Sequence, residues 1–237
     1  MKHRYTKDFI LTLILRTIGN FMILSSLFFI GKTFYQPVRE EVRYLYEKQI
    51  NKTYVVAAPG EEQRITREFS INAEKGSLSR AAKDAKLEVL VPLDTDFGIV
   101  IPKIAANSVV LPNVSVTDKD AYLTALQTGV AHAEGTAFPG EGGHIFMFAH
   151  STDYIWNVGT YNAVFYLLYK LEIGDEINIF YKGQRHVYKV TGKEVVDPTE
   201  VEYLTRKTDR EFLTLQTCWP PGTTLKRQLL FAERVSE

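Results

Sequence analysis

A single cysteine ends a strand-like run near the C-terminus. The run Phe-Leu-Thr-Leu-Gln-Thr-Cys (residues 212–218) holds the only cysteine of the chain, and Arg227 follows nine residues after Cys218. A cysteine nucleophile needs a base or cation that favours its thiolate and a donor for the oxyanion formed on attack. Arginine stays protonated and offers several donors, so Arg227 suits that second role. On these residues alone, an inert buried thiol and an arginine in a surface ion pair remain the alternatives.

A histidine at another strand end is the best partner for Cys218. The chain has five histidines, and His150 closes the apolar run His144-Ile-Phe-Met-Phe-Ala-His150. Reactive groups gather where strands end, because the sheet fixes them while solvent and substrate reach them. His132 lies in a loop after a predicted helix, and His186 follows a predicted turn and is expected to be solvated. A structural histidine is the alternative for His150.

The N-terminus predicts a membrane anchor. Phe9 to Ile30 is a 22-residue apolar run interrupted by Arg16 and Asn20. A helix of that length spans a hydrocarbon core of roughly 30 Å, and the long stem of Arg16 can snorkel toward the headgroups. The basic residues before the run keep residues 1–8 cytoplasmic by the positive-inside rule, which places everything after Lys32 outside. A cleaved signal peptide is the alternative, but no small-x-small cleavage site follows Ile30.

Residues 31–86 predict a juxtamembrane helix and a linker. Val38, Val42, Leu45 and Tyr46 have helical spacing within residues 34–49, whereas residues 51–86 show no sustained periodicity. The composition changes at about Leu87, where short β-branched and aromatic runs begin to recur. We therefore expect a globular domain over residues 87–237, exposed to the extracytoplasmic side.

The domain at residues 87–237 is predicted to be mainly β with short helices. Closely spaced strands favour a barrel or a sandwich; the expected strands are Phe97–Ile104, His144–Ala149, Glu176–Tyr181, His186–Val196, Phe212–Cys218 and Gln228–Val235. Lys182-Gly183-Gln184 predicts a hairpin turn between two of them. Two helices are expected, at Asp118–Thr128 with Thr117 or Asp118 as N-cap and at Tyr161–Leu171.

Composition excludes several classes of function. The 28 basic and 28 acidic residues balance, so no basic excess indicates nucleic-acid binding. One cysteine excludes an internal disulfide framework and a cysteine-cluster zinc site. We expect no metal and no cofactor. Asp197, Glu200 and Glu202 are a weak candidate for calcium, and a solvated loop is the expected reading.

Taken together, four ordered motifs make the chain resemble the sortases, membrane-anchored cysteine transpeptidases of bacterial surfaces. Thr214-Leu-Gln-Thr-Cys218 matches the family signature TLxTC, Phe148-Ala-His150-Ser151 matches its strand-ending histidine, and Arg227 matches its arginine. The stretch at residues 129–143 resembles the family's approach to the histidine. Ile101-Pro102-Lys103-Ile104 resembles its first-strand motif. The resemblance covers roughly residues 97–235.

The resemblance implies an eight-stranded barrel with Cys218 as nucleophile, His150 as general acid/base and Arg227 as stabiliser of the oxyanion and substrate. The implied reaction cuts an LPxTG-like motif of secreted proteins between threonine and glycine, through a thioacyl-enzyme. The acceptor would be an amine of a peptidoglycan precursor or a pilin lysine. Thr217, Trp219 and His132 are weak candidates for substrate contacts.

Two departures from the family pattern leave the subclass open. Trp219-Pro220-Pro221-Gly222 differs from the best-known housekeeping members, and no Asp-Pro-Trp lid anchor precedes the domain. The two prolines and the tryptophan stiffen that loop and place an aromatic surface near the thiol. The alternatives to transfer are a membrane-anchored cysteine peptidase that hydrolyses and a non-catalytic module that binds surface peptides.

Overall fold

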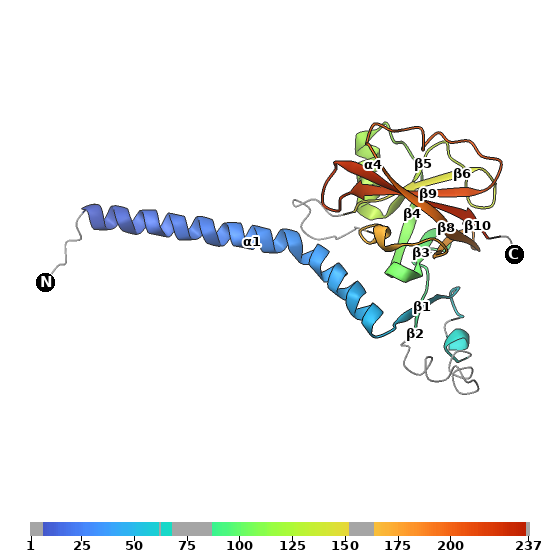
Figure 1. The fold of residues 1–237 in the computed structure, drawn as a ribbon, viewed down its shortest axis with the longest axis horizontal. Helices are drawn as coiled ribbons and strands as arrows, with labels where there is room; N and C mark the ends of the chain where they lie inside the picture. The colour runs from blue at the N-terminus through green and yellow to red at the C-terminus, as the bar shows by residue number, and fades with distance from the viewer. Residues whose placement is uncertain (1–6, 62, 68–86, 152–163, 236–237) are drawn as a thin grey trace. The chain divides into compact units, whose positions relative to one another are not determined.

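The computed structural model describes residues 7–61, 63–67, 87–151 and 164–235. The chain divides into two units: residues 1–41, whose described part is helical, and residues 42–237, which hold the described strands (Figure 1). The helix α1 (Lys7–Gln49) runs through the first unit and into the second. The predicted anchor and the predicted juxtamembrane helix are therefore parts of one helix.

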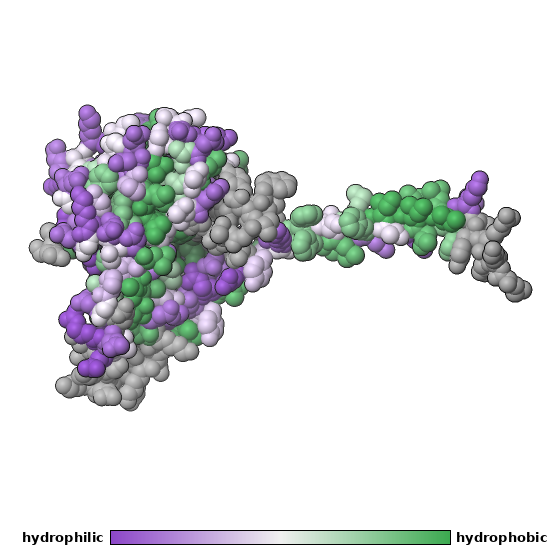
Figure 2. Space-filling view, turned by 180° about the vertical axis from the view of Figure 1, so that it is seen from behind, coloured by the Kyte–Doolittle hydropathy of each residue, from purple (hydrophilic) through white to green (hydrophobic). Residues whose placement is uncertain are grey.

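The first part of α1 is long and apolar enough to cross a membrane. Among the described residues, Lys7–Lys32 is the one such segment, with mean hydropathy 1.8 and none of its window buried. Figure 2 shows a largely apolar surface along this stretch. Hydroxyl groups within it donate to the carbonyl four residues earlier, as Thr12 does to Asp8 at 2.8 Å and Ser26 to Met22 at 2.8 Å. Such bonds satisfy polar side chains where no water is present.

Eight strands close into a barrel, which confirms the fold expected from the family resemblance. Its strand order is β10-β8-β7-β3-β4-β5-β6-β9 (Figure 1). The strands are β3 (Phe97–Ile101), β4 (Ala106–Val114), β5 (Val130–Ala133), β6 (His144–Phe148), β7 (Glu176–Tyr181), β8 (Gln184–Val196), β9 (Phe212–Trp219) and β10 (Lys226–Arg234). Two pairings are parallel, β4 with β5 and β6 with β9. The other six are antiparallel.

Apolar side chains from every strand fill the barrel. Ile99, Ile145, Leu213 and Leu230 are fully buried in one continuous core. The hairpin between β7 and β8 turns at Lys182 and Gly183, both with positive φ (50° and 78°). Positive φ at both central residues matches the right-handed twist of the flanking strands. The turn predicted from Lys182-Gly183-Gln184 is confirmed.

The helices agree with the sequence only in part. Helix α4 (Lys119–Thr128) begins at Asp118, whose carboxylate accepts from the amides of Asp120 and Ala121, so Asp118 is the N-cap. The helix expected over Tyr161–Leu171 begins outside the described residues. Its described part is a turn followed by the 3-10 helix η2 (Leu168–Lys170). Phe165, Leu168 and Leu171 are nonetheless fully buried, as the spacing predicted.

Two strands lie outside the barrel, one within the predicted linker and one at the start of the predicted domain. β1 (Thr53–Val56) pairs in parallel with β2 (Leu87–Leu90). Val56 and Leu90 pack on Val100 and Phe180, from the barrel strands β3 and β7, in a second small core. Between β3 and β4 lies the short 3-10 helix η1 (Pro102–Ile104). Burial against the barrel adds to the local strand preference of Thr53-Tyr-Val-Val56.

Burial of His144 predicts acid sensitivity. The ring is 6% exposed, and burial, aided by the cation of Arg206, lowers its pKa to about 4. The unfolded chain then binds more protons between pH 6.5 and 4, so stability is lost as pH falls through that range. Between pH 8 and pH 4, we expect His144→Gln to lose less unfolding free energy than the parent, by up to about 3 kcal/mol. His132, whose pKa burial also lowers, accounts for a remaining slope.

Urea unfolding from pH 8 to pH 4 measures this slope. The value at pH 8 gives the pH-independent cost of the substitution, which is subtracted. Parallel slopes for parent and variant would refute the assignment.

Candidate functional site

Cys218 and Arg227 face each other across two neighbouring strands. They are direct partners in the antiparallel register of β9 and β10. Directly opposed residues lie on the same face with Cβ atoms about 4.5–5.5 Å apart. The alternation of β9 sends Leu213 and Leu215 into the core, so Cys218 lies on the outer face of the sheet. Arg227 therefore shares that outer face.

The parallel pairing of β6 with β9 brings His150 to the same level. Phe148 pairs with Gln216, so the register extended by two residues places His150 opposite Cys218, on the same outer face. The amide of Ala149 donates to the carbonyl of Gln216 at 3.1 Å, which continues the ladder past the end of β6. Three neighbouring strands thus bring His150, Cys218 and Arg227 together at one end of the sheet.

Thr217, in β9, forms a hydrogen bond to Ala149, the residue before His150. Its side chain is buried at 4% exposure, and its hydroxyl donates to the carbonyl of Ala149 at 2.9 Å. Adjacent residues on a strand point to opposite faces, so Thr217 reaches inward while Cys218 faces outward. Thr217 holds the two strand ends in register from the inside, away from the face where a substrate would bind.

The electrostatics of Cys218 combine two opposed effects. Burial raises the pKa of the thiol, and the cation of Arg227 lowers it, with burial the larger effect. The guanidinium of Arg227 donates from Nη1 to the carbonyls of Thr224 and Lys226, at 3.1 and 3.2 Å. These bonds fix the cation to the connection that follows β9. The resting thiol is thus mostly protonated, beside a fixed positive charge.

The segment Phe165–Leu171 contacts two residues of the site, His150 and Trp219. The amide of Phe165 donates to the carbonyl of His150 at 3.3 Å. The ring of Tyr169 packs on the ring of Trp219, with centroids 5.5 Å apart. Trp219 is half-buried here, and the alternation of β9 puts it on the face opposite Cys218. It supports the strand end below the thiol.

A cation–π cluster that the sequence did not predict covers the other end of the same outer face. Arg206, on the connection between β8 and β9, lies 5.4, 5.3 and 5.2 Å from the ring centroids of Tyr203, Phe212 and Phe231. Such contacts are worth about 0.5–1 kcal/mol each at exposed sites. No spacing in the sequence relates Arg206 to these rings, because three separate segments supply them.

His132 and His186 have structural surroundings. His132 is fully buried; its Nε2 lies 3.0 Å from both the Ala137 carbonyl and the Thr136 hydroxyl, and its Nδ1 accepts from the Asn113 amide. The structure does not bring it to Cys218, and a substrate contact stays a prediction. His186 is 4% exposed, so the expectation of a solvated side chain is wrong. It packs against Gly140 instead.

The three carboxylates considered for calcium lie on the exposed connection after β8. The amide of Asp197 donates to Glu200 at 2.8 Å, and Lys226 lies 4.0 Å from the carboxylate of Asp197. Glu202 is exposed. These contacts organise a solvated loop.

Known proteins resemble this chain in fold and in sequence. The sortase domain model matches residues 99–235, more than half of the chain. The chain belongs to the sortase family. It is 30% identical to Sortase D of Bacillus subtilis (strain 168) over 139 residues, covering 57% of this chain and 62% of that relative.

Two solved sortases resemble the barrel of this sortase. The crystal structure of sortase C-1 from Actinomyces oris is 32% identical, with a TM-score of 0.50 over 61% of this chain and 75% of that one. The pilus-related Sortase C of Group B Streptococcus is 26% identical, with a TM-score of 0.50 over 61% of this chain and 69% of that one. The family match at residues 99–235 includes His150 just after β6, Cys218 near the end of β9 and Arg227 at the start of β10.

Removing the cation of Arg227 should make the thiolate harder to form. Because Arg227 lowers the pKa of Cys218, Arg227→Met leaves burial unopposed and raises that pKa. We expect the rate of Cys218 alkylation by iodoacetamide at pH 7.5 to fall, because a smaller fraction of the thiol is then ionised. Lys226→Met removes a neighbouring exposed cation and serves as control. Equal rates in the two variants would contradict the assignment.

Removing the hydroxyl of Thr217 should lower the free energy of unfolding. Thr217→Val keeps the shape but leaves the carbonyl of Ala149 without its donor, at a cost of about 1–3 kcal/mol. Thr217→Ser keeps the hydroxyl and should retain most of the unfolding free energy measured in urea. If valine and serine cost the same, the hydrogen bond to Ala149 does not hold the strand ends.

Proposed function

We propose that the chain is a membrane-anchored cysteine transpeptidase that cleaves an LPxTG-like sorting motif of secreted proteins. One observation supports the proposal: Cys218 pairs with Arg227 across β9 and β10, and the parallel register of β6 and β9, extended two residues beyond Phe148, puts His150 beside Cys218, in a chain of the sortase family. A nucleophile, a proton carrier and a fixed cation are the three groups that acyl transfer requires.

In the first half-reaction, the thiolate of Cys218 attacks the carbonyl carbon of the threonine in the motif. Arg227 donates to the oxygen as it becomes negative, which stabilises the tetrahedral intermediate. Protonated His150 gives its proton to the departing amine of the glycine, so that the C–N bond breaks and a thioester remains. The motif's C-terminal fragment leaves as a free amine.

The second half-reaction reverses these roles. An acceptor amine attacks the thioester carbonyl, neutral His150 takes the amine proton, and the C–S bond breaks. The products are a new amide and the thiolate of Cys218. The acceptor is an amine of a peptidoglycan precursor or a pilin lysine; one solved relative is described as pilus-related. Because burial raises the pKa of Cys218, only a minority of molecules hold the thiolate near neutral pH, and turnover is slow.

The helix α1 supports a location at the membrane. Lys7–Lys32 is long and apolar enough to cross the bilayer, and in this proposal the positive residues at the N-terminus keep that end cytoplasmic. The barrel then meets proteins after their secretion. Simple hydrolysis uses the same residues and differs only in the acceptor.

Trapping the thioester tests the chemistry and the substrate together. The purified protein is incubated with a library of sorting-motif peptides and analysed by intact mass and peptide mapping. We expect an acyl adduct on Cys218 that lacks the C-terminal fragment of the motif, and no adduct in Cys218→Ala. Adding triglycine or a lysine-bearing pilin peptide should convert the adduct to an amide.

The controls separate the rival functions. Release of free acid with no amide at any amine concentration would indicate a peptidase. Peptide binding without an adduct would indicate a non-catalytic module. Either outcome overturns the proposal.

A further inference from the structure

The last two turns of α1 are built into the barrel unit. From Val42 onward the helix belongs to the compact unit that contains the strands. Residues predicted to form its apolar face, Val42, Leu45 and Tyr46, are each more than half exposed. Arg43, Tyr44 and Glu47 are half-buried instead, and Tyr44 packs against the main barrel core. This part of the helix therefore attaches to the barrel by polar and aromatic side chains.

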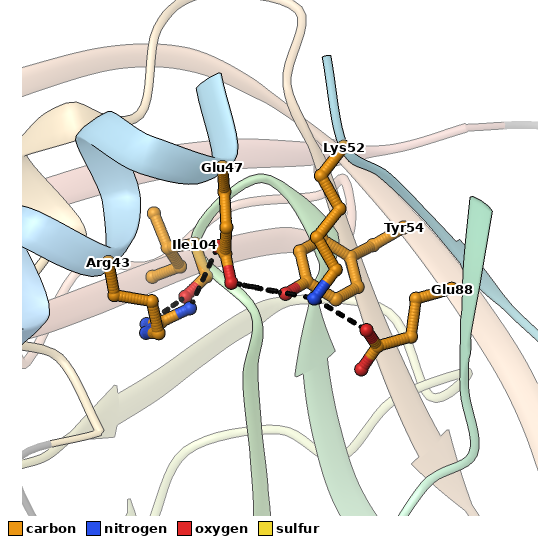
Figure 3. Close-up of polar contacts among 6 residues, drawn as sticks. All are labelled: Arg43, Glu47, Lys52, Tyr54, Glu88 and Ile104. Atoms are coloured by element: carbon orange, nitrogen blue, oxygen red, sulfur yellow. Dashed lines mark hydrogen bonds and ion pairs between the residues drawn. The ribbon is translucent and has the colours of Figure 1, made fainter. Parts of the chain in front are cut away.

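A polar network centred on Glu47 holds this helix end in place (Figure 3). Arg43 pairs with Glu47 at 3.1 Å and donates to the carbonyl of Ile104, in η1, at 3.2 Å. The hydroxyl of Tyr54, in β1, donates to Glu47 at 2.7 Å. Lys52 lies 3.6 Å from Glu47 and 2.5 Å from Glu88, in β2. The helix is thus bonded to the barrel and to the β1–β2 pair, which itself packs on the barrel.

An aromatic and cationic contact series leads from this helix end to the site. The ammonium of Lys170 lies 5.3 Å from the ring centroid of Tyr44 and 4.7 Å from that of Tyr169. Tyr169 in turn packs on Trp219, the residue after Cys218. Lys193 donates to the carbonyls of Tyr169 and Leu171, both at 3.0 Å, and so fixes the same segment to β8.

The segment between these contacts also reaches the second reactive residue. Phe165, Leu168 and Leu171 are fully buried, so the segment moves little by itself. Its first residue bonds the carbonyl of His150, and Tyr169 supports Trp219. One rigid segment therefore contacts His150 itself and Trp219, the neighbour of Cys218, with Tyr44 on its other side.

We propose that the juxtamembrane end of α1 is a positioning element of the active site, with Tyr44 acting through the segment Phe165–Leu171 on Trp219 and His150. The proposal rests on the function proposed above. In this scheme the helix that anchors the protein also sets the geometry of the cysteine and histidine, so displacing that helix end lowers the rate of acyl transfer. Geometry errors on the order of 1 Å can cost catalysis up to about 10²-fold.

Matched tyrosine substitutions on the same helix test the proposal in the full-length protein, in detergent or nanodiscs. Tyr44→Leu removes the ring beneath Lys170, while Tyr46→Leu makes the same change at a side chain that is 57% exposed. Tyr44→Phe keeps the ring face for the cation. For Tyr44→Leu we expect kcat for peptide transfer to fall about 3- to 10-fold with KM within about twofold. The phenylalanine variant and Tyr46→Leu should match the parent.

Two readouts need no substrate. In a Trp156→Phe background Trp219 is the only tryptophan, and its quenching by acrylamide should increase in Tyr44→Leu. The rate of Cys218 alkylation should change in the same variant. If the parent transfers no peptide, the proposed function fails, whereas quenching and alkylation still decide the coupling.

Two further variants test the same coupling if Tyr44→Leu does not fold. Lys170→Met removes the charge but keeps an apolar stem, and Glu47→Gln weakens the polar network without touching the aromatic series. Glu176→Gln, which breaks a similar arginine pair of 3.0 Å on the barrel, is the control for Glu47→Gln. Quenching, alkylation and kcat equal to the controls in every folded variant would overturn the proposal.

Discussion

The parallel pairing of β6 with β9 is the constraint on which the site depends. His150 and Cys218 are 68 residues apart, and only adjacent parallel strands bring both of their C-terminal ends to the same edge of the sheet. Bonds from Ala149 to Gln216 and from Thr217 to Ala149 extend that pairing beyond the last strand residue of β6. Arg227 then follows from the simplest connection, an antiparallel return into β10. The rest of the barrel keeps these three strand ends buried on one side and accessible on the other.

Much of this arrangement could be predicted from residues alone. Cys218 and His150 were assigned because each ends an apolar run, and the parallel register of β6 and β9, extended beyond Phe148, is consistent with these two ends lying side by side. Of the strands expected for their β-branched and aromatic residues, Glu176–Tyr181 has its predicted bounds, and the other five differ from the observed strands by one to three residues at one or both ends. Their side chains carry a strong local preference that the barrel does not override. The eight-strand count, in contrast, came from the family resemblance.

What the sequence did not predict depends on contacts between distant segments. β4 contains Pro112 and several polar residues, and β5 is only four residues long and half alanine, so neither shows a strand pattern. The pairing of β1 with β2 joins segments that are far apart in sequence. Arg206 over its three rings and Tyr44 beside Lys170 likewise have no signature in spacing. The face of α1 that packs on the barrel was not predicted, because its contacts are polar and aromatic rather than aliphatic.

The burial that raises the pKa of the Cys218 thiol has a consequence for the oxidation of that thiol. Peroxide and foreign disulfides react with thiolates, not with protonated thiols, so a thiol that is mostly neutral at rest oxidises slowly. The chain has no second cysteine with which an oxidised Cys218 could form an intramolecular disulfide. Under the proposed function, the same low population of thiolate that slows each turnover would also protect the only sulfhydryl group in the chain from oxidation.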